Sequence, residues 1–137
     1  FDAKSGHYFT EIEQSVQYLK QNINSLDLRE KKIIIVGYSQ GGYLAPFLSQ
    51  ESEVNVVRTI GLNCRLKENV QVQNIKGDYI GIHGESDEIV DCKLSEEAFL
   101  HHQKKGLNGE FIKIAGVGHG LSGQLLGKLK SKIQEVL

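Results

Sequence analysis

Three residues spread along the chain have the types needed for nucleophilic catalysis. Ser39 lies in Gly-Tyr-Ser-Gln-Gly, which fits the pattern Gly-x-Ser-x-Gly, Asp87 lies in His-Gly-Glu-Ser-Asp-Glu-Ile-Val, and His119 stands between two glycines. A serine hydroxyl is a poor nucleophile until a base removes its proton, and histidine is the most common base. A carboxylate behind the histidine holds its tautomer. The set Ser39, Asp87 and His119 therefore predicts acyl transfer to a serine.

Each of these residues has a distinct expected role. We expect His119 to act as general base toward Ser39 and then as general acid toward the leaving group, while Asp87 orients the imidazole and stabilises its charged form. The backbone N–H of Gln40 is expected to donate a hydrogen bond to the oxyanion that forms on the substrate. Water activated by His119 would then release the acyl group.

The context of the serine supports this interpretation. Residues 32–36 form a β-branched run that predicts a buried parallel strand ending at Gly37. A helix pattern follows directly and contains Pro46, which should kink or shorten the helix. A serine between strand and helix occupies a sharp, strained turn, and glycines on both sides leave room for the neighbouring backbone. The glycine after the serine in this motif is Gly41.

The remaining pattern predicts how the chain is organised. A capping box at Thr10 and Glu13 precedes helical periodicity, and Ser122 is placed to cap a last helix. The expected helices cover about 8–25, 94–104 and the segment after 122, and the expected strands cover 54–62, 78–83 and 110–115, with a polar loop at 63–77. Strands alternating with helices predict an α/β domain with a mostly parallel four-stranded sheet flanked by helices. The serine, the aspartate and the histidine then follow the carboxyl ends of their strands, where sites in such sheets form.

Composition narrows the function classes. The 137 residues suit one domain, the net charge of −1 does not favour nucleic acid, and the apolar runs are too short for a transmembrane segment. Cys64 and Cys92 are expected to be free thiols in a reducing compartment, which favours a cytoplasmic location. Cys92 has no activating base nearby in the sequence. No cofactor is expected, because no Cys, His or Asp spacing is typical of a metal site and the glycines around 116–123 lack a P-loop lysine.

Three segments together resemble a known group of enzymes. GYSQGG, HGESDEIV and GVGHGL resemble the carboxylesterase, lysophospholipase and acyl-protein thioesterase group of α/β-hydrolases. The resemblance implies a three-layer α/β-hydrolase fold, a small-molecule ester or thioester substrate with a small to medium apolar acyl group, catalytic roles for Ser39, Asp87 and His119, and an oxyanion role for Gln40. The stretch Asn63-Cys64-Arg65 departs from the small-residue loop of that group, and Val90-Asp91 departs from its common Val-Pro.

The resemblance also implies parts that this sequence lacks. The group has further strands upstream and a His-Gly-x-Gly-like loop that supplies a second oxyanion donor, and no segment here matches that loop. We therefore expect residues 1–137 to be the C-terminal portion of a single α/β-hydrolase domain, with the N-terminal strands pairing along the open edge of the first strand. The alternative is that a second chain supplies those strands. A homodimer is a separate expectation for the assembly.

Other interpretations stay open at this point. The same triad could serve a peptidase or an acyl hydrolase acting on sugar or aryl esters, and the chain could be a non-catalytic α/β binding domain. Ser39 could act only as a helix N-cap. Asp87 has the nearby rivals Glu85, Glu88 and Asp91. Of the other histidines, His83 is expected to pack or bond locally at a strand end, and His101 and His102 are expected at the surface of a helix.

Overall fold

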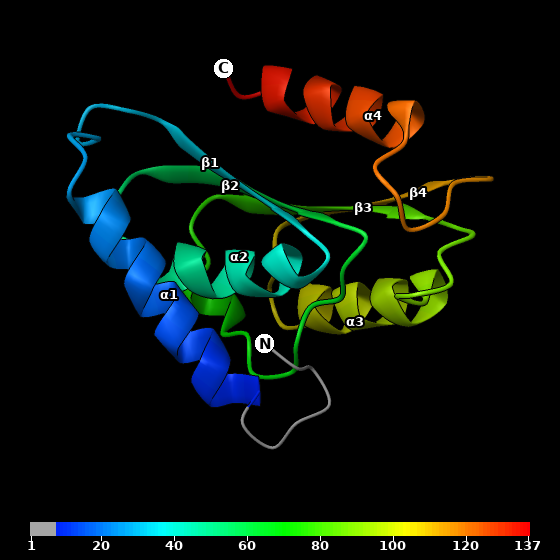
Figure 1. Cartoon of the computed structure of the whole chain (residues 1–137), viewed down its shortest axis with the longest axis horizontal. Helices are drawn as coiled ribbons and strands as arrows, with labels where there is room; N and C mark the ends of the chain where they lie inside the picture. Colours follow the sequence, from blue (N-terminus) through cyan, green and yellow to red (C-terminus); the bar gives the residue numbers. More distant parts are fainter. Residues whose placement is uncertain (1–7) are drawn as a thin grey trace.

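The computed structural model describes residues 8–137 as alternating helices and strands (Figure 1). The elements follow the chain as α1 (Tyr8–Asn24), β1 (Ile33–Tyr38), α2 (Gln40–Glu51), β2 (Val56–Leu62), a short 3₁₀ turn η1 (Val72–Asn74), β3 (Asp78–Gly84), α3 (Cys92–Lys104), β4 (Gly109–Ile114) and α4 (Gly123–Gln134). The sequence predicted each helix and each strand, with boundaries that differ by one or two residues at most of their ends. Phe1 and Asp2, which resemble the Trp-Phe-Asp that precedes the first helix in the same group of enzymes, lie outside the described residues.

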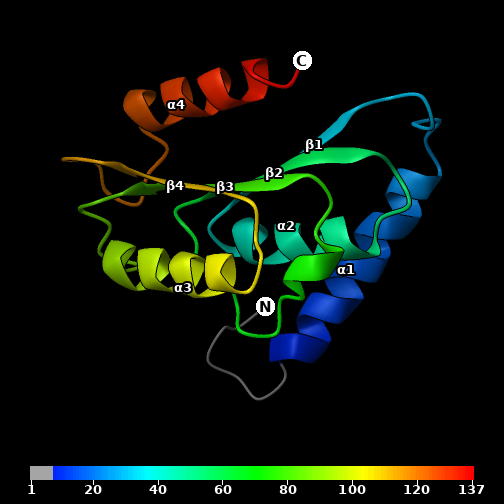
Figure 2. The same cartoon turned by 180° about the vertical axis from the view of Figure 1, so that it is seen from behind.

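The four strands form one parallel sheet in the order β1-β2-β3-β4. The register aligns Tyr38 with Leu62, Leu62 with Ile82, and Ile82 with Ile112. The carboxyl ends of the strands therefore meet at one edge of the sheet, as expected for parallel strands. Helices α1, α2 and α3 cover one face and α4 covers the other, which gives three layers (Figures 1 and 2). The predicted α/β architecture is confirmed.

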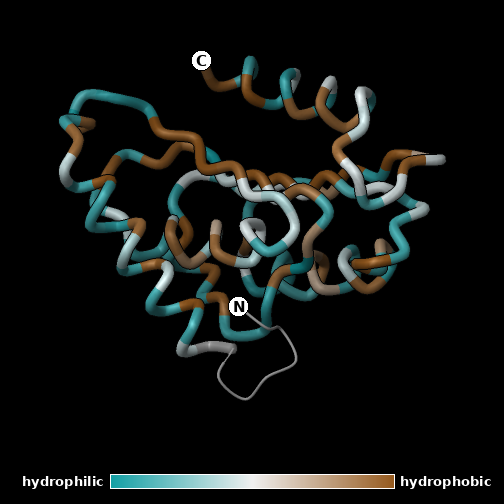
Figure 3. Tube along the Cα trace, viewed as in Figure 1, coloured by the Kyte–Doolittle hydropathy of each residue, from teal (hydrophilic) through white to brown (hydrophobic). Residues whose placement is uncertain are grey.

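Two hydrophobic clusters hold these layers together, one on each face of the sheet. The cluster beneath α4 contains Ile60, Leu62, Ile80 and Ile82 of the central strands, with Val117 and Leu125. The cluster on the other face contains Ile12, Val16, Phe47, Leu48, Tyr79 and Phe99, among others. In Figure 3 the apolar residues run along the strands, while the outer turns of α1 are hydrophilic. Strands β2 and β3 are paired on both sides, so they lie at the centre of the sheet, and both contribute side chains to the cluster beneath α4.

Several local expectations are corrected. Strand β1 does not stop at Gly37 but continues to Tyr38, because both residues keep pairing with β2. It is also less buried than predicted, since Val36 is 42 % exposed. Helix α1 begins at Tyr8, which places Thr10 inside the helix and not at its cap. Helix α2 continues through Pro46 to Glu51, so the proline does not end it.

The connection from β2 to β3 is a loop, as predicted, with only the single turn η1. His102 of α3 fastens this loop. The sequence placed His102 at the surface, but it is buried, and its ring nitrogens lie 2.7 Å from the Ala98 carbonyl oxygen and 3.1 Å from that of Lys67. The prediction was wrong because the loop folds over this side of α3, a long-range contact that helical periodicity does not encode.

Ion pairs tie α4 to the amino-terminal end of the sheet. Arg58 of β2 forms two hydrogen bonds with the Asp78 carboxylate, at 2.8 and 2.7 Å. Its remaining nitrogen donates to the Lys132 carbonyl oxygen at 2.7 Å and to Glu135 at 2.8 Å. The guanidinium is largely buried, and its nitrogens donate to acceptors on β3 and near the end of α4. A buried cation is tolerated in such a geometry.

Among residues 8–137, no helix has the length and apolar character required to cross a membrane.

Candidate active site

The nucleophile candidate sits in the turn between β1 and α2. Ser39 is the single residue between the strand and the helix, and its backbone adopts φ 51° and ψ −115°. A non-glycine residue at positive φ is strained, and such strain persists only where the surroundings fix it. The Ser39 N–H donates to the Leu62 carbonyl oxygen at 2.9 Å, and the Gly42 N–H donates to the Ser39 carbonyl oxygen at 3.0 Å. These bonds hold the turn against the end of β2.

Glycine is required at Gly37 because the helix crosses directly over the strand. A Cβ at Gly37 would lie 2.7 Å from the Gly42 Cα and closer still to the Gly41 carbonyl. A Cβ at Gly42 would lie 2.6 Å from the Cys64 Cβ and closer to its sulfur. The sequence pattern predicted close approaches at both Gly41 and Gly42. The one at Gly42 is confirmed, but within the described chain nothing lies within 4 Å of a Cβ placed at Gly41. A side chain at Gly37 would clash with the backbone of Gly41. A side chain at Gly41 itself would meet no nearby atom of the described chain.

The structure brings the three predicted side chains into one hydrogen-bonded row. The Ser39 Oγ lies 3.0 Å from the His119 Nε2, and the His119 Nδ1 lies 2.8 Å from the Asp87 Oδ2. Because a carboxylate only accepts, the Nδ1 carries a proton and the Nε2 accepts from the serine hydroxyl. The Ser39 side chain makes no cap hydrogen bond to α2. The arrangement leaves the histidine placed to remove the serine proton.

The surroundings of Asp87 keep its carboxylate charged. The residue is 7 % exposed, and its Oδ1 accepts from the backbone N–H groups of Ile89 and Val90, each at 2.9 Å. Burial raises the pKa of Asp87, but the N–H groups of Val90 and Ile89 and the His119 ring outweigh it, so the pKa lies below its usual value. An ionised Asp87 is therefore available to accept from His119.

A second histidine borders the same carboxylate. His83 is 1 % exposed, and its Nε2 lies 2.8 Å from the Val90 carbonyl oxygen and 3.3 Å from the Asp87 Oδ2. A carbonyl oxygen only accepts, so the Nε2 of His83 is a donor. The Nδ1 has no hydrogen-bond partner in the described part of the chain. His83 bonds locally, as its position at a strand end suggested, but its approach to Asp87 was not predicted.

The other polar residues of this region have different places. Asp91 caps α3 by accepting from the Leu94 N–H at 2.8 Å, and Glu85 and Glu88 are exposed. Of the four acids in this loop, Asp87 is the one that contacts His119. Gln40 is the first residue of α2, and backbone N–H groups in a first helical turn point toward the amino end of the helix, where negative charge is favoured.

The cysteines are free thiols, as predicted. Burial, with the nearby Tyr79 and Lys67 in smaller opposition, raises the pKa of Cys64 to about 12. Burial also raises the pKa of Cys92 to about 11, with help from the charges of Glu85 and Glu96. Thiols held in their neutral form are weak nucleophiles.

Two residues that hold the histidine were missed at the sequence level. The Tyr38 hydroxyl donates to the His119 carbonyl oxygen at 2.8 Å. The Asn63 Nδ2 donates to the same oxygen at 2.6 Å and lies 3.3 Å from the Gly118 carbonyl oxygen. The available signal was indirect: Tyr38 adjoins the serine, and Asn63 directly follows the strand beside it.

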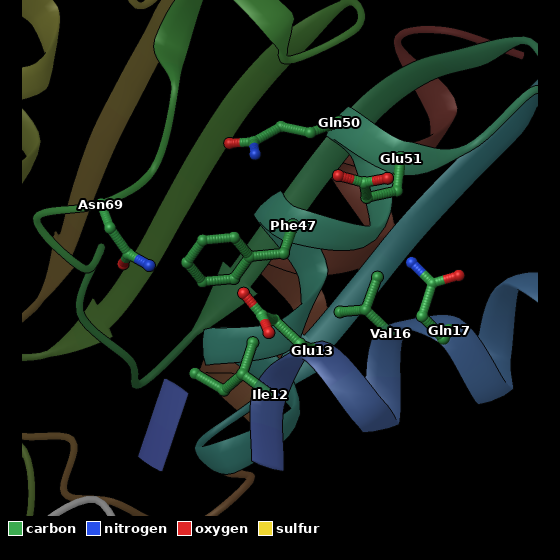
Figure 4. A pocket seen from close by; sticks show the side chains of 8 residues that line it. All are labelled: Ile12, Glu13, Val16, Gln17, Phe47, Gln50, Glu51 and Asn69. Atoms are coloured by element: carbon green, nitrogen blue, oxygen red, sulfur yellow. The ribbon is translucent and has the colours of Figure 1, made fainter. Parts of the chain in front are cut away.

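A pocket between α1 and α2 lies apart from the row formed by Ser39, His119 and Asp87. Figure 4 shows its walls, which come from both helices and from the loop after β2. The lining residues are Ile12, Glu13, Val16, Gln17, Phe47, Gln50, Glu51 and Asn69. Gln50 and Glu51 lie at the far end of α2 from Ser39, so this pocket does not adjoin the nucleophile candidate.

Known proteins resemble this chain in both sequence and fold. Residues 3–137 match the phospholipase/carboxylesterase family model. Acyl-protein thioesterase 1 homolog 1 of Dictyostelium discoideum is 30 % identical over 125 residues, which cover 87 % of this chain and 55 % of that protein. Homolog 2 of the same organism is 26 % identical over 113 residues, covering 78 % and 51 %. The chain thus spans about half the length of the curated relatives it matches.

Solved structures show the same fold at low sequence identity. Acyl-protein thioesterase 2 of Zea mays superposes with a TM-score of 0.77 at 16 % identity, over 98 % of this chain and 68 % of that one. Esterase PE8 superposes with a TM-score of 0.75 at 19 % identity, over 100 % of this chain and 68 % of that one. The fold expected from the sequence is confirmed, and the chain belongs to the phospholipase/carboxylesterase family of α/β-hydrolases.

Proposed function

We propose that the protein is a serine hydrolase that cleaves a carboxylic ester or thioester through an acyl-enzyme on Ser39. The observation that carries this proposal is the continuous row from the Ser39 Oγ to the His119 Nε2 at 3.0 Å and from the His119 Nδ1 to the Asp87 Oδ2 at 2.8 Å. The row joins a nucleophile, a base and an orienting carboxylate from three different parts of the chain, and a serine that only capped its helix would need none of them.

The chemistry follows from these positions. The Ser39 oxygen attacks the substrate carbonyl carbon while its proton passes to the His119 Nε2. Asp87 accepts the Nδ1–H and stabilises the imidazolium. The Gln40 backbone N–H, at the amino end of α2, donates to the oxyanion. When the tetrahedral intermediate collapses, His119 protonates the leaving alcohol or thiol, and a water deprotonated by His119 then releases the carboxylic acid and restores Ser39.

The substrate class is inferred from family membership and from the relatives. The matched family is described as phospholipase/carboxylesterase, and two relatives carry the name acyl-protein thioesterase. An oxygen ester and a thioester present the same electrophilic carbonyl, so one site is suited to both. From the family resemblance, we place the acyl group in the small to medium apolar class. We place the protein in a reducing compartment such as the cytoplasm, because its two cysteines are unpaired.

An activity-based probe tests this proposal directly. A fluorophosphonate should form one covalent adduct, located on Ser39 by peptide mass analysis, and Ser39→Ala should abolish the labelling. Ser86→Ala removes an exposed serine of the neighbouring loop and should leave labelling unchanged. Labelling that persists in Ser39→Ala would overturn the proposal.

A panel of substrates then distinguishes an ester or thioester hydrolase from a peptidase. Esters and thioesters of increasing acyl length should be hydrolysed, and aminoacyl amides should not. Hydrolysis of the amides with equal efficiency would identify a peptidase. A folded full-length protein that is neither labelled nor active would favour a binding domain.

A further inference from the structure

We propose that Asn63 and Tyr38 are positioning residues that fix the main chain of His119 and thereby set its ring between Ser39 and Asp87. This inference rests on the proposed function for its catalytic meaning. It assigns a role to two side chains that touch neither the nucleophile oxygen nor the carboxylate. Both act on the backbone of the base through one shared acceptor, the His119 carbonyl oxygen.

Asn63 is built into the strand ends. It is 0 % exposed and adopts φ 46°, a conformation that non-glycine residues rarely take, although asparagine is among those that tolerate it best. Its Oδ1 accepts from the Gly84 N–H at 2.9 Å, and its Nδ2 donates to the carbonyl oxygens of His119 at 2.6 Å and Gly118 at 3.3 Å. One side chain therefore joins the end of β2, the end of β3 and the loop that carries the base.

Tyr38 reaches the same carbonyl from the end of β1. Its hydroxyl donates to the His119 oxygen at 2.8 Å, and its ring centre lies 5.3 Å from that of the imidazole. Tyr38 directly precedes Ser39. The nucleophile and the hydroxyl that holds the His119 backbone therefore come from adjacent residues of the chain. A movement of the turn would therefore carry both groups together.

The need for such restraints is set by the local sequence. His119 stands between Gly118 and Gly120, and glycine backbones rotate more freely than any other. Rotation about this segment would move the Nε2 away from the serine and the Nδ1 away from the carboxylate. A misplacement of about 1 Å in a catalytic group can cost about 10²-fold in rate. An asparagine is suited to this place because it offers two donors and an acceptor, which aspartate and serine do not.

A double-mutant cycle tests the proposal. Tyr38→Phe, Asn63→Ser and the double variant are compared with the wild type by the rate constant for labelling of Ser39 with a fluorophosphonate. Each single variant leaves one donor on the His119 carbonyl, so we expect about tenfold slower labelling in each. The double variant leaves none, so we expect about a thousandfold loss, more than the product of the single effects.

A spectroscopic readout separates positioning from mere stability. The proton on the His119 Nδ1, held by Asp87 at 2.8 Å, should give a downfield NMR resonance whose position and width report the His119–Asp87 geometry independently of activity. We expect it to shift in the single variants and to broaden or vanish in the double variant. Tyr79→Phe is the matched control. It removes a buried hydroxyl that lies 3.8 Å from the Cys64 sulfur, and it should change neither readout.

The outcomes distinguish this inference from the proposed function. A wild type that is not labelled on Ser39 defeats the proposed function, while the Nδ1 resonance still decides the positioning role. A folded double variant with wild-type labelling and an unchanged resonance overturns the inference. If the double variant does not fold, Tyr38→Phe, which removes a single oxygen atom, decides by the same two readouts.

Discussion

The His119 Nδ1 lies 2.8 Å from the Asp87 Oδ2, and the other oxygen of that carboxylate accepts from two backbone N–H groups. Asp87→Asn keeps the size of the side chain but offers an amide where a carboxylate accepted, which favours the wrong tautomer of His119. We expect fluorophosphonate labelling of Ser39 to slow by about 10⁴-fold while the fold is retained. Labelling rates and circular dichroism measure the two effects. A loss of less than tenfold would show that Asp87 does not orient His119.

The same variant should reveal a pH-dependent contribution to stability. The pKa of Asp87 in the folded chain lies below 3.8, its ordinary value. The ionised carboxylate therefore stabilises the fold at pH values above 3.8, and this contribution is lost as the pH falls through the folded pKa. Urea unfolding between pH 7 and pH 3 should show an advantage of the wild type over Asp87→Asn that is constant near neutrality and shrinks below pH 4. An advantage that grew on acidification would contradict this sign.

Two glycines of the serine motif should respond oppositely to the same change. Gly37→Ala forces a methyl group into the backbone of Gly41 and Gly42, so we expect a loss of about 3 kcal/mol in the free energy of unfolding. Gly41→Ala places its methyl group in open space within the described chain, and alanine favours the helix. We expect this variant to be unchanged or stabilised by up to about 1 kcal/mol. Urea denaturation of both variants measures the difference, and equal losses would contradict the described crossing of α2 over β1.

The Arg58 network should matter far more than a surface ion pair. Arg58→Met removes the partner of Asp78 and the tether of α4, leaving a partly buried carboxylate unpaired, so we expect a loss of about 3 kcal/mol. The control is Arg29→Met, because the Arg29–Asp27 pair is exposed, with side chains 87 % and 78 % accessible. That change should cost about 0.5 kcal/mol or less. Similar losses in both variants would refute a stabilising role for the buried network.

Neither thiol should react in the folded chain. With the pKa of Cys64 raised to about 12 and that of Cys92 to about 11, about one thiol in a thousand or fewer is ionised at pH 8. A disulfide reagent should therefore detect no fast-reacting thiol in the native protein and two thiols in urea. Fast modification of Cys92 in the native state would contradict its burial.

The sequence predicted the placement of the polar row because the strand order is simple. Ser39, Asp87 and His119 each follow a strand, and in a parallel sheet the carboxyl ends share one edge, so their meeting did not depend on fine detail. The residues that hold the His119 backbone could not be predicted in the same way. Asn63 contacts His119 across 56 residues and Tyr38 across 81. Tyr38 occupies a variable position of Gly-x-Ser-x-Gly and Asn63 lies outside the three matched segments, so no motif predicts either contact.

The errors have the same origin. Periodicity in α3 could not reveal that the loop after β2 covers His102, and the Gly-x-Ser-x-Gly pattern could not tell which glycine meets the crossing backbone at its Cβ. Local sequence patterns indicate whether a segment is a helix or a strand and which way it runs. The packing between elements depends on contacts between residues far apart in the sequence, which these patterns do not contain.

The order β1-β2-β3-β4 in space is also the order of the strands in the chain. During synthesis, each new strand could dock beside the one made before it, without waiting for a later segment to be inserted between them. The Ser39 turn precedes β2 in the chain, whereas His119 lies beyond β4. In the proposed mechanism, a growing chain that ends before β4 holds Ser39 but lacks the base that would activate it, so acyl transfer requires β4 and the residues that follow it.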